Sequence, residues 1–229
     1  MAEKTIDIAS PILSRNERLA DQLRQRFNEA GTFVINVLSS PGSGKTTTIL
    51  GTNERLRDKA GLRCAVIEGD IASDVDAITM KEAGMPAIQI NTGGLCHLEG
   101  NMIMEAVDAF DQAVGLENID VIFIENVGNL VCPVDFDLGE NLSIMILSVP
   151  EGDDKPLKYP LMFSICDVVL INKIDVLPYF DFDVEKCKEY IKRRNPNAKV
   201  FMVCAKTGEG IDEWAQWLLS EVKSWRDEK

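Results

Sequence analysis

The sequence lacks the features that would place the chain outside the cell or in a membrane. No apolar run approaches the roughly 20 residues that a helix needs to cross a bilayer. The first residues show no basic segment followed by an apolar one, which is the pattern of a secretory leader. The six cysteines are irregularly spaced, unlike the disulfide framework of a small secreted protein. We therefore expect a cytoplasmic protein that does not act at a membrane.

Basic residues are also scarce. The chain has 24 Lys and Arg against 37 Asp and Glu, which gives a formal net charge of −13. Such a chain is a poor candidate for binding nucleic acid, because that binding requires basic side chains facing the phosphates. A nucleotide remains a feasible ligand, since backbone N–H groups hold phosphate whatever the overall charge. The negative net charge is also compatible with a protein that binds cations, but its contribution to solubility is the simpler explanation.

The patterning of the 229 residues predicts one α/β domain preceded by a helical extension over residues 1–31. In that extension Leu19, Leu23 and Phe27 recur every four residues among charged neighbours, which indicates an amphipathic helix that Gly31 ends. Because this helix precedes the first strand, we expect it to form an extra layer or to pack against a partner.

Residues 32–229 alternate between short apolar runs and helical patterns. This alternation predicts a doubly wound, mostly parallel seven-stranded sheet with helices on both faces. The expected strands are 33–39, 63–68, 87–91, 121–125, 143–149, 168–172 and 199–204, and the expected helices are 44–60, 74–84, 98–114, 184–194 and 211–225. The stretch 150–160 is polar, has three prolines and is expected to be a long loop.

A glycine-rich segment between the first strand and the next helix matches a phosphate-binding loop. Its residues are Ser39, Ser40, Pro41, Gly42, Ser43, Gly44, Lys45, Thr46 and Thr47. Its glycines let the backbone wrap round phosphate, Lys45 would reach the β- and γ-phosphates, and the Thr46 hydroxyl would bind Mg²⁺. Ser39 departs from the pattern, which has Gly there. The alternative is a glycine-rich turn without a ligand.

A second motif, Asn172, Lys173, Ile174 and Asp175, ends a later strand. The Asp175 carboxylate can accept two hydrogen bonds from guanine, whereas adenine would leave it unpaired, so the site would reject adenine. Ala205 and Lys206 follow the next strand and resemble the second guanine-contacting loop of GTPases. The alternative is a polar strand end without a ligand. Together the motifs predict a GTPase domain over residues 32–229.

Two carboxylates at strand ends are candidates for Mg²⁺ binding. Asp70 would contact the ion directly or through water, and Glu125 stands where GTPases usually have Asp. Three residues later, the Gly128 N–H could sense the γ-phosphate and order a switch segment. Lys45, Asp70 and Glu125 are therefore the candidate catalytic residues, and no residue stands out to orient the attacking water. The alternative for either carboxylate is a solvated strand end.

The only histidine in the chain, His97, directly follows Cys96 in a glycine-rich turn. A thiolate and an imidazole suit Zn²⁺ or Ni²⁺. Cys132 could join them if the strands ending at Asn91 and Glu125 lie near each other. Three ligands leave the site incomplete, so water, a backbone group or a second subunit must finish it. A partly buried cysteine beside a helix-capping histidine is the alternative.

Several phrases of the sequence resemble the HypB family, whose members are GTPases and metallochaperones that help insert nickel into [NiFe]-hydrogenase. The phrases are Ser39–Thr47, Cys96–Glu99, Glu125–Pro133, Glu151–Asp154 and Asn172–Asp175. The resemblance implies the dimeric P-loop class of signal-recognition GTPases and MinD. It also implies a GTP-dependent homodimer with a metal site of Cys96, His97 and Cys132 near the interface, and a lysine, best matched by Lys158, that assists nucleotide binding or dimerisation.

The resemblance further implies GTP and GDP as ligands, and the hydrogenase large subunit or a companion nickel-maturation protein as partner. The chain departs from the family pattern at Gly94, where a Lys is usual. It also has no N-terminal Cys-rich or His-rich tract, so we expect no nickel storage. Alternative interpretations are an assembly GTPase without a metal, a urease accessory GTPase, and a GTP-binding scaffold without turnover. The urease accessory family has a Cys-Pro-His metal motif, whereas Cys96 and His97 have no Pro between them.

Overall fold

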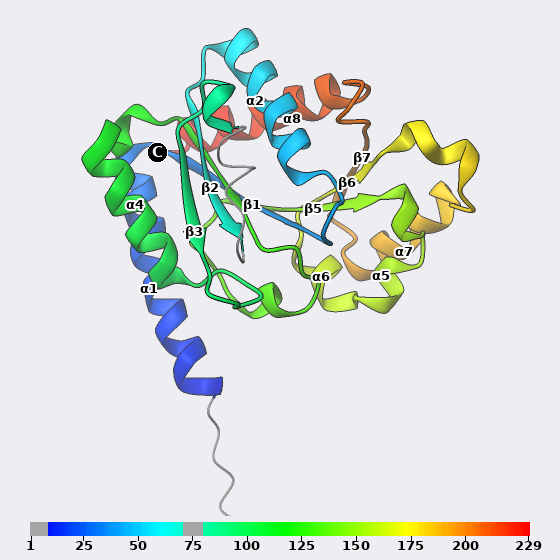
Figure 1. Cartoon of the computed structure of the whole chain (residues 1–229), viewed down its shortest axis with the longest axis horizontal. Coiled ribbons are helices and arrows are strands. Elements are labelled where there is room, and N and C mark those ends of the chain that lie inside the picture. Colours follow the sequence, from blue (N-terminus) through cyan, green and yellow to red (C-terminus); the bar gives the residue numbers. More distant parts are fainter. Residues whose placement is uncertain (1–8, 71–79) are drawn as a thin grey trace, which may run out of the picture.

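The computed structural model describes residues 9–70 and 80–229, which form a central sheet with helices on both faces (Figure 1). All neighbouring strands run parallel, in the order β3-β2-β4-β1-β5-β6-β7. The strands are β1 Phe33–Ser39, β2 Cys64–Asp70, β3 Ala87–Asn91, β4 Val121–Glu125, β5 Leu142–Ser148, β6 Val168–Asn172 and β7 Lys199–Met202. The prediction of a doubly wound, seven-stranded sheet is confirmed.

The helices fill the segments between the strands. They are α1 Ala9–Ala30, α2 Lys45–Ala60, α4 Gly100–Val114, α5 Lys155–Lys158, α6 Pro160–Ile165, α7 Val184–Arg194 and α8 Ile211–Asp227. Within the described residues, four 3₁₀ turns accompany them: η1 Leu116–Asn118, η2 Cys132–Asp135, η3 Val149–Glu151 and η4 Ile174–Tyr179. The predicted helix over 74–84 lies mainly outside the described residues. Among those residues, no helix is both long and apolar enough to cross a membrane.

The prediction of a long loop over 150–160 is wrong. The segment contains most of η3, all of α5 and the start of α6. Its prolines stand in the first turns of these elements, at Pro150, Pro156 and Pro160. A proline is tolerated there because its missing N–H would have no partner within the helix, so these prolines begin short helices rather than mark a loop.

The side chains of β1 alternate between two cores. Ile35 and Val37 pack under α2 and α8, on the face that buries Trp214. Val34 faces the other way, with α1 and α4. A third cluster lies beneath α6 and α7. Both faces of the sheet are therefore covered, which explains why the strand sequences are nearly continuously apolar.

The amphipathic helix that the sequence predicts at the N-terminal end is α1. Leu23 and Phe27 are fully buried against α4 and the sheet. The helix ends at Gly31, whose φ of 75° belongs to the left-handed region that favours glycine. The helix thus shares a layer with α4 (Figure 1). The domain boundary after residue 31 stays a prediction.

Candidate functional site

The glycine-rich loop after β1 lies at the carboxyl edge of the sheet. There β1 has β4 on one side and β5 on the other, and such a reversal of strand order is where parallel sheets hold ligands. Gly42 and Gly44 have φ values of 74° and 97°. These angles turn the chain from β1 into α2, which begins at Lys45. The loop therefore has the strand-to-helix placement that phosphate binding requires.

Asn172 at the end of β6 connects this loop to the segment after β7. Its side-chain Nδ2 donates to the Ser43 carbonyl at 2.8 Å, and its Oδ1 accepts the Ala205 N–H at 3.1 Å. A Cβ at Gly44 would lie 2.6 Å from the same Nδ2, so this glycine is also needed for close approach. The buried Asn172 amide thereby fixes the distance between two segments expected to bind the nucleotide.

The expected guanine-reading residues share a cavity of about 390 Å³. Lys173, Asp175, Ala205 and Lys206 line it together with Gly44 and Thr47 of the phosphate loop. Lys173 has a φ of 62°, the only left-handed value of a described non-glycine residue, and its Nζ donates to the Gly42 carbonyl at 2.6 Å. Residues of the two motifs therefore line one cavity.

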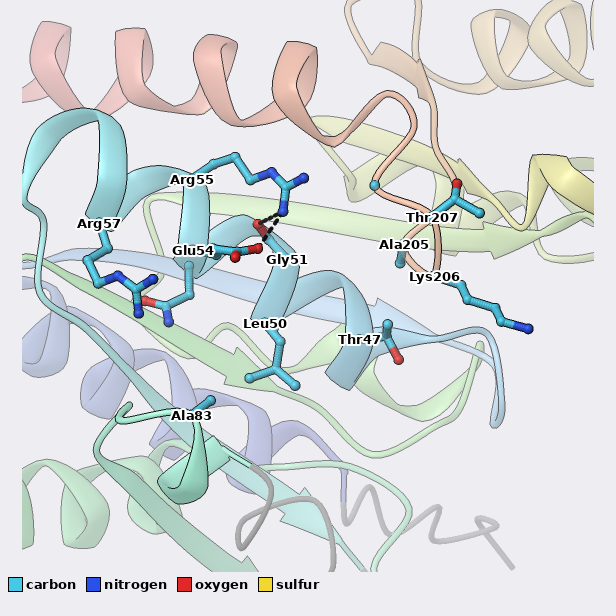
Figure 2. Close-up of a pocket in the computed structure, with 12 residues that line it drawn as sticks. Thr47, Leu50, Gly51, Glu54, Arg55, Arg57, Ala83, Ala205, Lys206 and Thr207 are labelled. Carbon is cyan, nitrogen blue, oxygen red and sulfur yellow. Dashed lines mark hydrogen bonds and ion pairs between the residues drawn. The ribbon is translucent and has the colours of Figure 1, made fainter.

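A larger hollow of about 610 Å³ continues past this cavity along α2. Figure 2 shows Leu50, Arg55 and Arg57 on the α2 side, with Ala205 and Lys206 across from them. The arginines are occupied by carboxylates, because Arg55 pairs with Glu54 at 2.6 Å and Arg57 with Asp58 at 3.0 Å. The hollow therefore widens the approach to the guanine cavity without adding a free positive cluster.

The expected magnesium residues lie beside the phosphate loop. The Thr46 Oγ1 donates to Oε1 of the buried Glu125 at 3.0 Å. Lys45 Nζ donates to the Ser39 hydroxyl at 3.2 Å, so the residue that departs from the pattern contacts the lysine. Gly128 meets the loop closely, since a Cβ there would lie 2.9 Å from the Pro41 nitrogen. The hydroxyl and carboxylate oxygens are the ligand type that Mg²⁺ prefers.

The cysteine–histidine cluster forms as the sequence predicts. The ligand atoms of Cys96, His97 and Cys132 all lie within 4.8 Å of one another. The Cys96 thiol donates to the Cys132 sulfur at 2.6 Å, and the Asn129 amide donates to that sulfur at 3.3 Å. The hydrogen bond to Cys132, together with burial, raises the pKa of the Cys96 thiol. Two thiols and one imidazole fit a borderline metal.

The imidazole of His97 is oriented from two sides. Its Nδ1 lies 3.8 Å from the Cys96 sulfur, and its Nε2 lies 3.4 Å from a carboxylate oxygen of Glu99. Its ring stacks on Phe136 with centroids 4.0 Å apart. A histidine that ligates a metal with one nitrogen commonly directs the other toward a carboxylate. Glu99 and Phe136 were not assigned roles from the sequence. The Phe136 contact depends on how the two turns meet, whereas Glu99 contacts His97 within the same turn.

The turns that carry Cys96 and Cys132 meet across an intervening strand. The strands ending at Asn91 and Glu125 are not neighbours, because β2 lies between β3 and β4. The turn after β3 crosses the end of β2 instead, with Leu98 packed over Gly69. A Cβ at Gly69 would lie 2.7–2.8 Å from Leu98 side-chain atoms, so the glycine is what admits the crossing. This crossing brings Cys96 to Cys132.

Two further predicted residues are Asp70 and Lys158. Asp70, partly buried, ends β2 and its carbonyl accepts the Thr92 N–H at 3.0 Å. Lys158 on α5 is 60% exposed and pairs with Asp154 at 2.6 Å, which raises its pKa. Outside the cluster, Cys64, Cys166 and Cys204 are buried free thiols. The sequence had assigned no role to Asn126, whose amide accepts the Leu98 N–H at 3.2 Å.

Comparisons with known proteins agree with these motifs. The family described as CobW/HypB/UreG, nucleotide-binding domain, matches residues 33–202. The hydrogenase maturation factor HypB of Azotobacter chroococcum mcd 1 is 50% identical over 215 residues, which cover 94% of this chain and 68% of that protein.

Solved structures give the same result. HypB from Helicobacter pylori in complex with nickel superposes with a TM-score of 0.87 at 40% identity, covering 92% of this chain and 96% of that one. HypB from Archaeoglobus fulgidus has a TM-score of 0.83 at 39% identity, covering 91% and 99%. The resemblance seen in the sequence motifs is thereby confirmed, and the chain belongs to the HypB family of hydrogenase maturation factors.

Proposed function

We propose that this protein is a GTP-hydrolysing metallochaperone that helps insert nickel during [NiFe]-hydrogenase maturation. The observation that carries the proposal is the pairing of Thr46 with Glu125 at 3.0 Å, followed seven residues later by Cys132 in the cysteine–histidine cluster. A short chain segment thus joins the phosphate loop to the nickel ligands. The protein acts in the cytoplasm, as a homodimer, with the hydrogenase large subunit or a companion nickel-maturation protein as partner.

The nucleotide takes its place along the edge of the sheet. Its phosphates are held by the loop from Pro41 to Thr47, with Lys45 facing the γ-phosphate. Asp175 accepts the guanine N1–H and amine, while Asn172, Lys173, Ala205 and Lys206 frame the base. That assignment is supported by the cavity in which these residues meet the loop.

Thr46, Asp70 and Glu125 would hold Mg²⁺, which supplies positive charge against the phosphates when bound. Lys45 neutralises the charge that builds up as the γ-phosphoryl group leaves, and the Gly128 N–H detects whether that group is present. Glu125 and Gly128 then change their contacts on hydrolysis, and the segment to Cys132 moves with them. Lys158, which is exposed on α5, would assist from the partner subunit of the dimer.

Nickel is the cargo, bound by Cys96, His97 and Cys132. Three ligands leave a coordination position open, which suits an ion that must be passed on, and the second subunit lies near it in the dimer. Zn²⁺ is the alternative ion for the same ligand set. The protons of the thiols leave when the ion binds, because thiolate is the ligating form.

The test is a titration of Ni²⁺ and Zn²⁺ into nucleotide-free, GDP-bound and GTP-analogue-bound protein, following thiolate-to-metal charge-transfer absorption and dimer mass. The signal should depend on nucleotide and be lost in Cys96→Ala and Cys132→Ala. Cys187→Ala removes a buried thiol outside the cluster and should leave the signal unchanged. No metal signal in any nucleotide state would favour an assembly GTPase without a metal.

The guanine assignment and turnover are tested separately. Asp175→Asn should shift preference from GTP toward xanthosine triphosphate, because the amide then donates where the carboxylate accepted. An unchanged preference would contradict the assignment. Phosphate release from GTP should fall below detection in Lys45→Ala. If wild-type protein with Mg²⁺ and bound GTP released no phosphate, the chain would be a GTP-binding scaffold without turnover.

A further inference from the structure

We propose that Asn16 on α1 is a positioning residue of the nickel site, which sets the spacing between the two segments that carry its ligands. The inference rests on the proposed nickel function. It concerns a residue far from the ligands in sequence, in the helix that the sequence alone marked only as an extra packing layer. The observation that supports the inference is that the buried Asn16 amide hydrogen-bonds to both segments that carry the ligands.

The Asn16 side chain is 4% exposed and uses both ends of its amide. Its Oδ1 accepts the Gly100 N–H at 2.7 Å, and its Nδ2 donates to the Asp137 carbonyl at 2.8 Å. Gly100 begins α4, and Asp137 follows η2. These two backbone groups belong to different segments, so a single planar amide fixes the distance between them.

Both contacts lie close to the ligands along the chain. Gly100 comes three residues after His97, and Asp137 comes five residues after Cys132. Phe136, which precedes Asp137, is the residue whose ring stacks on His97 at 4.0 Å. Holding the Asp137 carbonyl therefore holds the peptide next to the stacked ring, while holding the Gly100 N–H fixes the segment from which the imidazole projects.

The backbone of α1 approaches both segments closely at two glycines. A Cβ at Gly100 would lie 2.9 Å from the Leu19 Cβ. A Cβ at Gly139 would lie 2.9 Å from the Ala20 carbonyl oxygen, and this glycine has a φ of 79°. The helix α1 is therefore in close contact with both ligand-bearing segments, and the Asn16 amide bonds to each of them.

Such a clamp matters because ligand geometry must be held within about 0.5 Å for productive binding. The thiol of Cys132 and the imidazole of His97 come from separate turns, so their spacing is set by what joins these turns. Partners beyond the first ligands typically change metal affinity about 10–100-fold when removed. Asn16 acts through the backbone of Gly100 and Asp137 and touches no ligand atom itself.

The experiment compares Asn16→Ala and Asn16→Asp with a matched control, Asn195→Ala. Asn195 also has two side-chain bonds to backbone, donating to the Cys166 carbonyl at 2.9 Å and accepting the Asn197 N–H at 3.0 Å. It lies far from the cluster in sequence, at the end of α7. Nickel affinity and the thiolate charge-transfer spectrum, GDP affinity and the urea midpoint are measured for each full-length variant.

We expect Asn16→Ala to weaken Ni²⁺ binding about tenfold or more and to alter the charge-transfer spectrum, with GDP affinity unchanged within twofold. Asn16→Asp keeps the acceptor for the Gly100 N–H but loses the donor to the Asp137 carbonyl. Its nickel affinity should therefore fall between those of wild type and Asn16→Ala. Asn195→Ala should lower the urea midpoint with nickel binding unchanged. Wild-type nickel affinity in both Asn16 variants, or an equal loss of nickel affinity in Asn195→Ala, would contradict the positioning role of Asn16. Neither result would contradict the proposed nickel site.

If the nickel signal instead survived in Cys96→Ala and Cys132→Ala, the proposed site and the clamp would both be overturned. Should Asn16→Ala fail to fold, Asn16→Asp retains the size of the side chain and decides the question alone: wild-type affinity and spectrum in that variant contradict the proposal.

Discussion

The side-chain oxygen of Asn126 accepts the backbone N–H of Leu98 at 3.2 Å. This bond joins the segment after Glu125, beside the phosphate loop, to the turn that carries the imidazole of the metal cluster. The same amide donates to the Asn36 Oδ1 at 3.3 Å, so it also anchors the turn to β1. A physical connection between nucleotide and metal residues therefore exists besides the chain segment leading to Cys132.

Replacing Asn126 with Ala should uncouple the two sites. The change leaves the buried Leu98 N–H without its partner, so we expect the free energy of unfolding to fall by about 1–3 kcal/mol. It should also reduce the ratio of nickel affinities between the GDP-bound and GTP-analogue-bound states toward one. Urea denaturation and nickel titration in both nucleotide states measure these effects.

Asn141→Ala is the matched control, because its Oδ1 likewise accepts a backbone N–H, that of Val34 near the start of β1, at 2.8 Å. It should lower stability and keep the nucleotide dependence of nickel binding. A wild-type ratio in Asn126→Ala would show that this amide carries no coupling.

Replacing Asn172 with Ala should weaken GDP and GTP binding by about tenfold even though the change removes no charged group. Ser43 and Ala205 are each held by this amide, and without it the phosphate loop and the guanine-contacting loop lose their fixed separation. Equilibrium binding of a fluorescent GDP analogue measures the loss. The Ser220→Ala variant removes an exposed hydroxyl on α8 and should bind as wild type. Unchanged affinity in Asn172→Ala would contradict the positioning role.

The sequence predicted the sheet well because most strands are nearly continuously apolar and most are followed by a helical pattern. It failed at 150–160 because prolines mark both loops and helix starts, and only the backbone distinguishes the two. The phosphate and guanine motifs could be found because their chemistry is local. The contacts of Asn126 and Asn16 could not, since each joins segments that are far apart in the sequence and whose meeting depends on strand order.

The crossing at Gly69 illustrates the same limit. Nothing in the sequence says that Leu98 packs over this glycine. The sequence therefore made the cluster conditional on two strands lying near each other and could not show how Cys96 reaches Cys132. The contact between the turn after β3 and the segment after β4 crosses the end of β2, so it can be predicted only once the strand order β3-β2-β4 is known.

Replacing Gly128 with Ala should weaken triphosphate binding more than diphosphate binding. The new methyl group would lie 2.9 Å from the Pro41 nitrogen, so the segment after Glu125 must retreat from the phosphate loop. We expect a loss of at least about threefold in GTP-analogue affinity, or about 0.7 kcal/mol, with a smaller loss for GDP.

Gly51→Ala is the control for this change. Gly51 lies within α2, and its new methyl group would meet Ile211 at an ordinary 3.7 Å. Since Ala favours a helix over Gly by about 0.8–1 kcal/mol, this variant should be as stable as wild type or more so, with unchanged nucleotide binding. Equal loss of both nucleotides in Gly128→Ala would argue against a γ-phosphate sensor.

Replacing Glu140 with Gln should cost more stability in acid than near neutrality. Burial raises the pKa of this carboxyl, although the Asn36 side chain donates a hydrogen bond that opposes the shift. Because the folded-state pKa lies above the unfolded value of 4.5, the folded protein binds the proton more tightly. The stabilising contribution is therefore full below that value and is lost as the pH rises through the folded-state pKa.

Urea unfolding of wild type and Glu140→Gln between pH 4.5 and 8 should thus show their difference shrinking as the pH rises, by at most about 1.4 kcal/mol per pH unit. Asp120→Asn is the control of opposite sign. Burial raises the pKa of Asp120, but hydrogen bonds from Arg63 and Arg226 outweigh it and lower the pKa below 3.8. Its contribution is complete above that value, so the difference between wild type and Asp120→Asn should stay constant over the same range. A constant difference for Glu140→Gln as well would mean that its carboxyl is ionised in the folded protein, held in that form by its three hydrogen-bond donors, Asn36, Leu138 and Ser143.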